Sequence, residues 1–138
     1  MQKLKSAKQR FLDRFQRDLD GIESQAPMTG SYERIRPYIV EQSIGGEQYE
    51  IIIYHKESEA WFGNGGFDWS LQYYHDHKFV RPGDVAFDLG SNSGVITAYL
   101  GLAVGPRGRV LAFDPYPWNA LATHYNARLN HLDNVLAY

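Results

Sequence analysis

The sequence contains no cysteine, so disulfide bonds, thiolate metal sites and cysteine nucleophiles are excluded. It also has no long hydrophobic run. The longest stretch of low polarity, Val95–Val104, is shorter than the ~20 residues that a transmembrane helix needs. No apolar segment of the secretory type follows the basic N-terminus, because Asp13 and Arg14 interrupt the apolar residues there. We therefore expect a soluble, cytoplasmic protein without a membrane span.

A large excess of charge of one sign is also lacking, since the formal net charge is −2 over 138 residues. That balance predicts no nucleic-acid partner. The charge is uneven, however, because residues 1–17 hold six basic residues and one acid. Such an arm can contact a membrane surface, RNA or an acidic partner, but a helix with a solvated basic face explains it more simply. The length fits one domain, or one domain with an arm.

The first part of the chain predicts a helix followed by a β-hairpin. Apolar residues three and four positions apart favour a helix over residues 4–22, ended near Gly21. Two strand-like runs, residues 38–44 and 48–55, flank a Gly-Gly pair that is typical of a hairpin turn.

Two segments of this part predict irregular structure. Residues 23–37 contain two prolines and a glycine and predict a linker, and residues 57–66 predict a loop. Within that loop, Trp61 and Phe62 favour a hydrophobic plug over a mobile lid. Asp68 is then expected to cap a helix over residues 69–79.

The rest of the chain alternates strands and helices. The strands are expected at residues 85–89, 109–113 and 135–138, and the helices at 95–104 and over the apolar repeat that starts at Trp118. The continuous apolar run at 85–89 predicts a strand that is buried on both faces. This order predicts an α/β fold with a parallel sheet and right-handed crossovers. We divide the chain into residues 1–79, with the helix, hairpin and capping helix, and a Rossmann-like domain at 80–138.

A short glycine-bounded loop follows the first of these strands, between Asp88 and Gly94. Gly90 lets the chain turn sharply out of the strand, and Gly94 permits a close approach at the start of the next helix. The N-terminus of that helix offers N–H groups and a partial positive charge to a carboxylate or a phosphate. The loop Asp88, Gly90, Ser91, Asn92 and Gly94 is therefore the predicted cofactor-binding segment.

The spacing within this loop discriminates between cofactors. A dinucleotide fingerprint that starts at Gly90 needs glycine at positions 92 and 95, where the chain has Asn92 and Val95. The Gly-Lys pair of a phosphate-binding P-loop is absent as well. The carboxylate of Asp88 repels pyrophosphate but suits a cationic ligand, such as S-adenosylmethionine (SAM).

A second carboxylate, Asp114, ends the second strand 20 residues after Gly94. An acid at this place accepts hydrogen bonds from both hydroxyls of a ribose, which suits an adenosine cofactor. Tyr116 follows closely, and we expect its ring to lie against the adenine. The alternative is that both acids only bind the N–H groups of their own loops.

Residues 80–138 resemble the start of a class I SAM-dependent methyltransferase, and more narrowly of the FkbM family. An acid-proline pair ends the second strand in that family, and here it is Asp114-Pro115. Asn92 matches an asparagine that is typical of its glycine loop. The segments that carry the resemblance are Arg81–Asp84, Phe87–Gly94, Val104–Val110, Ala112–Pro115 with Asn119, and Asn126–Val135. The resemblance implies SAM binding by the Asp88–Gly94 loop and by Asp114, with methyl transfer to a hydroxyl of a small molecule or sugar.

A class I methyltransferase fold has seven strands, and this sequence predicts two and the beginning of a third. We therefore expect a fold truncated after β-α-β-α(β), with weak SAM binding by the chain alone. The strand at 85–89 should keep an open edge for self-association or for a complementing chain. A non-catalytic interaction module is the alternative, and a nicotinamide-binding protein is disfavoured by the loop spacing.

The histidines provide weaker signals. His75 and His77 lie two residues apart on a predicted helix and face nearly opposite ways, so we expect no metal site there. His55, at a strand end, is a conceivable general base. No catalytic residue is assigned from the sequence.

Overall fold

The computed structural model describes residues 6–64 and 69–138, without the side chains of Trp69 and Ser70. The first part contains two strands and short helices around them: α1 (Ala7–Glu23), η1 (Gly30–Tyr32), β1 (Arg34–Ile44), β2 (Glu47–His55), α2 (Lys56–Phe62) and α3 (Trp69–Asp76). The second part alternates strand and helix: β3 (Val85–Leu89), α4 (Val95–Val104), β4 (Arg109–Phe113), α5 (Pro117–Leu129) and β5 (Val135–Ala137).

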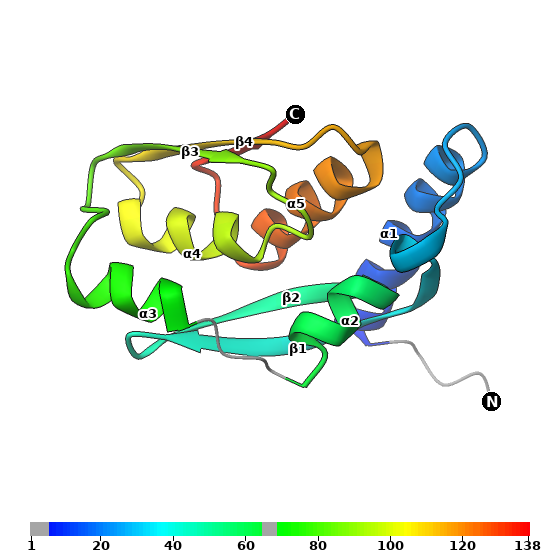
Figure 1. The fold of residues 1–138 in the computed structure, drawn as a ribbon, viewed down its shortest axis with the longest axis horizontal. Helices are drawn as coiled ribbons and strands as arrows, with labels where there is room; N and C mark the ends of the chain where they lie inside the picture. Colours follow the sequence, from blue (N-terminus) through cyan, green and yellow to red (C-terminus); the bar gives the residue numbers. More distant parts are fainter. Residues whose placement is uncertain (1–5, 65–68) are drawn as a thin grey trace.

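These elements form three layers (Figure 1). The strands β3, β4 and β5 pair in parallel, in the order β3-β4-β5. Helices α4 and α5 lie between this sheet and the antiparallel hairpin of β1 and β2, and α1 lies beside α5. The parallel βαβαβ unit is Rossmann-like, as the sequence predicts.

The hairpin is joined to the second part through polar side chains of α5. The outer edge of β2 pairs with no strand among the described residues, and its N–H groups are bonded by side chains instead. The Asn130 Oδ1 atom accepts from the Glu50 N–H at 2.7 Å, and the Asn126 Oδ1 atom accepts from the Ile52 N–H at 2.8 Å. The edge is therefore covered without another strand, which protects it from pairing with a second chain.

Two of the hydrophobic clusters contain residues of both parts of the chain. Phe15 and Leu19 of α1 pack with Tyr54 of β2 and with Tyr125 of α5, and all four are buried. Ile51 and Ile53, on the opposite face of the same strand, pack against α4. The two parts thus share apolar contacts, and the division at residues 79 and 80 stays a prediction.

The structure confirms the predicted positions of four features to within a few residues: the hairpin, β3, α4 and β4. Several other boundaries differ. Helix α1 continues beyond Gly21 and ends at Glu23, where Ser24 forms the C-cap. The predicted linker at residues 23–37 contains η1 and the start of β1, because Pro37 is accommodated at an irregularity in the strand register.

The segment that follows the hairpin also differs from the prediction. The predicted loop at residues 57–66 begins with helix α2, because His55 acts as its N-cap in a capping box with Ser58. Helix α3 ends at Asp76, three residues before the predicted end. The predicted cap Asp68 lies outside the described residues.

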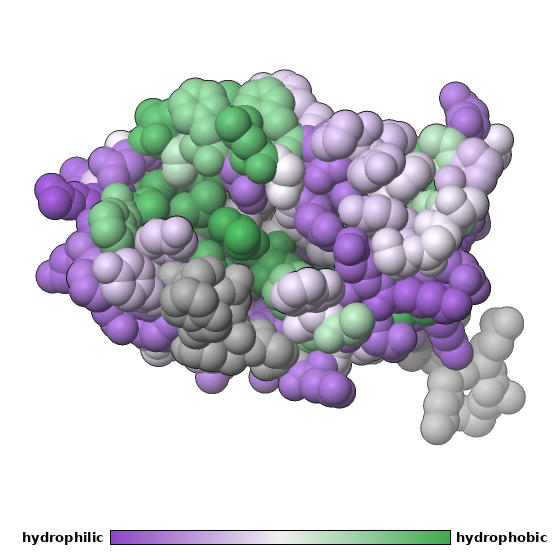
Figure 2. Space-filling model, in the orientation of Figure 1, coloured by the Kyte–Doolittle hydropathy of each residue, from purple (hydrophilic) through white to green (hydrophobic). Residues whose placement is uncertain are grey.

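The outer face of the parallel sheet carries exposed apolar side chains. Val85, Phe87 and Leu89 are 61%, 63% and 77% exposed, so the prediction of a strand buried on both faces is wrong. The inward side chains of β3 face α4 and are covered, whereas no described helix covers the outer face. We call this surface the outer sheet face; its other members are Leu111, Phe113, Leu136 and Tyr138. Figure 2 shows apolar residues gathered over the region where β3 and β4 run.

Candidate functional site

The glycine loop leaves β3 at the carboxyl end of the sheet. Gly90, Asn92 and Gly94 all have positive φ angles, of 84°, 46° and 78°. A Cβ atom on Gly90 would meet no atom within 4 Å, whereas one on Gly94 would lie 2.7 Å from the Cα of Thr123. Gly90 therefore makes the sharp turn and faces open space, and Gly94 lets the loop contact α5 closely.

The N–H groups of the loop are bound within the protein. Those of Gly90 and Ser91 donate to the Phe113 carbonyl, at 2.8 and 3.1 Å, and that of Gly94 donates to the Ser91 carbonyl. The Ser91 hydroxyl is buried 3.2 Å from the Thr123 hydroxyl. These bonds fix the shape of the loop, and the first turn of α4 holds the helix N–H groups that remain for a ligand.

Asp114 joins the two loops that the sequence assigns to the cofactor. Its Oδ2 atom accepts from the Asn92 N–H at 2.8 Å, and its Oδ1 atom accepts from the Tyr116 N–H at 2.9 Å and from the Asn119 Nδ2 atom at 3.0 Å. The carboxylate is half-buried. A carboxylate has about four lone-pair sites, so capacity remains for a further donor.

A chain of hydrogen bonds supports Asp114 from the hairpin. The Tyr54 hydroxyl donates to the Asn119 Oδ1 atom at 2.5 Å, and the Asn119 amide in turn donates to Asp114. Tyr54 and Asn119 are buried. Burial raises the pKa of Tyr54 well above its ordinary value, with a further contribution from the charge of Asp114. The hydroxyl therefore stays protonated and holds the amide in one orientation.

Asp88 lies on the inner face of β3 and is buried. Its Oδ2 atom accepts from the Thr97 hydroxyl of α4 at 2.5 Å. Burial raises the pKa of Asp88, the Thr97 bond opposes that rise, and the charge of Asp114 adds to it. Both acids thus have partners of their own, and Asp88 attaches β3 to α4.

His55 is buried beneath the glycine loop. Its Nδ1 atom accepts from the Ser58 N–H at 3.0 Å, and its Nε2 atom lies 3.4 Å from the Ser93 hydroxyl. Burial lowers its pKa to about 4, so the ring is neutral. With Nδ1 accepting, the proton is on Nε2 and faces Ser93. No lone pair of the ring is left for a substrate, so His55 is a structural residue rather than a general base.

Tyr116, at one side of the site, lies among other aromatic rings. Tyr116 is 41% exposed and stacks on Trp118, with ring centroids 4.8 Å apart and an interplanar angle of 10°. Tyr32 lies 5.1 Å from the Tyr116 ring. One face of Tyr116 is therefore covered by protein, while its remaining surface can contact a ligand. Pro115 beside it is exposed.

A cavity of about 240 Å³ adjoins the tip of the glycine loop. It lies between α2 and the loop, and is lined by Glu57, Ser58, Trp61, Phe62 and Asn92. Phe62 packs into the hydrophobic core, as a plug would, whereas Trp61 is 69% exposed.

The structure thus brings the predicted residues of the site together at the carboxyl ends of β3 and β4. Sequence reasoning assigned no role in the site to three further supports, Glu57, Asn119 and Asn126, although the last two lie in segments that carry the family resemblance. The Asn126 Nδ2 atom donates to the carbonyl of Ser93 at 2.6 Å. A polar residue on the buried side of an apolar helix was the signal for it.

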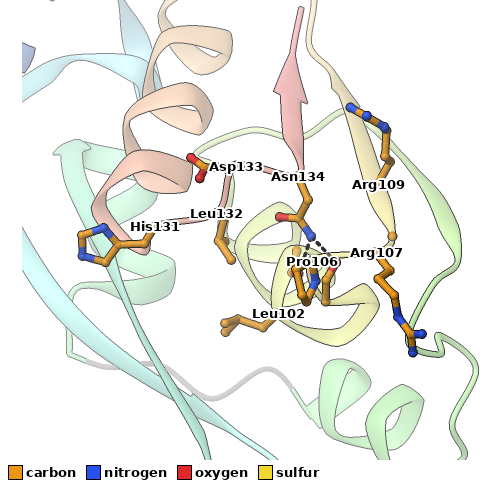
Figure 3. A pocket seen from close by; sticks show the side chains of 11 residues that line it. Leu102, Pro106, Arg107, Arg109, His131, Leu132, Asp133 and Asn134 are labelled. Carbon is orange, nitrogen blue, oxygen red and sulfur yellow. Dashed lines mark hydrogen bonds between the residues drawn. The ribbon is translucent and has the colours of Figure 1, made fainter.

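Another cavity, of about 360 Å³, lies at the opposite end of the sheet (Figure 3). The Asn134 Nδ2 atom there donates to the carbonyls of Gly101 and Gly105, at 2.9 and 2.8 Å, and so closes the end of α4. Arg107 and Arg109 point away from each other, so they do not converge on one ligand. This cavity is separate from the carboxylates of the site.

Residues 6–64 and 69–138 contain no group of three or more His, Cys, Asp or Glu residues that could hold a metal ion. None of the helices formed by these residues is long and apolar enough to cross a membrane.

No protein-family model matches the sequence, and no curated protein matches it either. The resemblance to the FkbM family therefore stays a prediction. The chain shows partial likeness to solved structures of methyltransferases. A SAM-dependent methyltransferase from Aquifex aeolicus is 22% identical, with a TM-score of 0.45, over 49% of this chain and 36% of that one.

Two further likenesses extend over most of this chain. Protein-L-isoaspartate O-methyltransferase is 15% identical, with a TM-score of 0.43, over 93% of this chain and 40% of its own. Coclaurine N-methyltransferase, bound to N-methylheliamine and S-adenosylhomocysteine (SAH), is 18% identical, with a TM-score of 0.46, over 98% of this chain and 38% of its own. The chain thus spans well under half the length of these proteins. The function proposed below rests on the residues of the site.

Proposed function

We propose that this chain is the cofactor-binding part of a SAM-dependent methyltransferase of the FkbM type, with a hydroxyl of a small molecule or sugar as the methyl acceptor. The observation that carries the proposal is Asp114. It stands at the end of β4, is held from three sides, and connects the glycine loop to the start of α5. A preorganised carboxylate beside an open Gly90 suits the ribose of an adenosine cofactor.

The residues present fit this cofactor. Asp114 would hold the ribose hydroxyls, the exposed surface of Tyr116 would contact the adenine, and the first turn of α4 would bind the carboxylate of the methionine moiety. Bound SAM supplies a methyl group on a positively charged sulfur, which a nucleophilic oxygen can accept. The chain contributes by fixing the position of the cofactor, which is a main source of rate enhancement in such transfers.

A non-catalytic interaction module is the second candidate. The exposed outer sheet face favours it, because contiguous apolar surface on a protein often marks an interaction site. SAH binding separates the two candidates, since a pure interaction module has no need to retain it.

Calorimetric titration of the 138-residue chain with SAH tests the first proposal. We expect weak, saturable binding, which becomes about tenfold weaker in Asp114→Asn because charge-assisted hydrogen bonds are lost. Asp76→Asn is the matched control, since Asp76 is exposed on α3 and is bonded there by Gln72. Absence of binding, or equal loss in both variants, would contradict the proposed site.

A further inference from the structure

The cavity beside the glycine loop combines a carboxylate with aromatic surface. Glu57 and Trp61 lie one helical turn apart on α2, and Phe62 follows directly. Among the residues that the structure describes, no lysine, arginine or histidine lines this cavity. Lys56, the cation next to it in the sequence, is paired with Glu33 at 2.7 Å. The cavity therefore presents net negative charge together with apolar walls.

Its exposed aromatic ring is set on a fixed support. Trp61 is 69% exposed, although Ser58 of the same helix is only 1% exposed and bonds His55 through both its N–H and its hydroxyl. The helix is thus anchored by its buried side and holds the indole at the cavity. A carboxylate near an aromatic face is the usual recognition surface for an organic cation.

The cavity also adjoins the proposed cofactor loop. The Asn92 Nδ2 atom donates to Glu57 at 3.3 Å, while the Asn92 N–H donates to Asp114. One loop residue therefore separates the cavity from the carboxylate assigned to the ribose. A molecule in the cavity would lie next to the cofactor and would share only Asn92 with the predicted cofactor loop.

We propose that this cavity binds the acceptor, and that the acceptor is a small organic cation that also carries a hydroxyl. Glu57 supplies the opposite charge, and Trp61 and Phe62 contact the apolar groups around the cationic nitrogen. The role of the cavity as an acceptor site rests on the proposed methyltransferase function, whereas its preference for a cation follows from the cavity alone.

Choline and its neutral isostere 3,3-dimethyl-1-butanol provide the test, because they differ in charge at nearly constant shape. Each is titrated into the isotopically labelled chain, and binding is followed by the NMR shifts of the Trp61 indole N–H and of the Asn92 amide. We expect choline to bind at least about fivefold more tightly than the neutral alcohol.

Two variants and one control variant identify the residues that recognise the cation. Glu57→Gln should remove the preference for choline while the neutral alcohol binds as before. Glu59→Gln is the matched control, since Glu59 is exposed on the same helix and accepts from the Tyr38 hydroxyl at 3.1 Å. Trp61→Leu, followed at the Asn92 amide, should weaken choline binding, because the aromatic face is lost.

Equal affinity for the two probes, or an unchanged preference in Glu57→Gln, would overturn the cation site. Displacement of choline by SAH would assign the cavity to the cofactor and overturn its role as an acceptor site. Choline binding that persists alongside bound SAH supports the proposal. Failure of SAH to bind concerns only the proposed function, because the probe experiment does not depend on it.

Discussion

At the scale of single residues, burial determines what His55 can do. A histidine at a strand end near a cofactor loop has the position of a general base. Here its ring nitrogens are used by Ser58 and Ser93, and desolvation lowers its pKa to about 4. Because the folded chain keeps His55 neutral, the free energy of unfolding should depend on pH.

We predict that the free energy of unfolding decreases as the pH falls from about 6.5 to about 4. In this window His55 stays neutral in the folded chain, whereas the unfolded chain binds a proton on the same side chain. Urea titrations at pH 7, 5.5 and 4.5 measure the effect. His55→Asn keeps an N-cap acceptor but does not titrate, so its stability should fall less over this range. The same decrease in both proteins would show that other groups cause it.

At the scale of elements, Asn126 joins α5 to both the hairpin and the glycine loop. Its amide bonds the Ile52 N–H and the Ser93 carbonyl, and all of these groups are buried. Removal of the side chain leaves one donor and one acceptor without a partner in the interior. Such groups carry their full desolvation cost.

We predict that Asn126→Ala lowers the free energy of unfolding by about 2–4 kcal/mol, from two unsatisfied buried groups. Urea denaturation provides the measurement. His124→Ala is the control, because His124 is exposed on the same helix and a change there should have little effect. A loss below about 1 kcal/mol, less than one unsatisfied group costs, would mean that water or a local shift replaces both bonds.

The elements also show how far the sequence could predict the structure. The ranges of β3, α4 and β4 agree with the predictions, because glycine or proline punctuation bounds each of them. Helix α2 was missed, since its N-cap is a histidine rather than one of the usual capping residues. Local patterns therefore predicted the second part of the chain better than the segments around the hairpin.

The sequence also predicted only some of the residues of the candidate site. Their positions at strand ends were sufficient to predict Asp88, Gly90, Gly94 and Asp114, because parallel strands bring their carboxyl ends to one edge of the sheet. Glu57 and Asn126 reach the same loop through contacts between segments distant in sequence. Periodicity and spacing carry no information about such contacts, so the partners of these two residues could not be found without the structure, although Asn126 is a polar residue on the buried side of an apolar helix.

At the scale of the whole molecule, the described residues cover the parallel sheet on one face only. Helices α4 and α5 pack on its inner face, and the outer sheet face remains exposed (Figures 1 and 2). The free edge of β3 adds N–H and C=O groups that pair with no described strand. An open edge next to exposed apolar side chains is a template for association.

We therefore predict that the 138-residue chain associates with itself through β3 at micromolar concentration, which light scattering measures directly. Phe87→Lys places a charge in the centre of the outer sheet face, where the wild-type side chain is 63% exposed. The fold should tolerate that change, and the average mass should shift toward the monomer. Tyr73→Lys, at a residue 49% exposed on α3, is the matched control and should leave the association unchanged. A well-folded wild-type monomer with exchange-protected amides at residues 85–89 would contradict the prediction, because the chain would then cover this edge by itself.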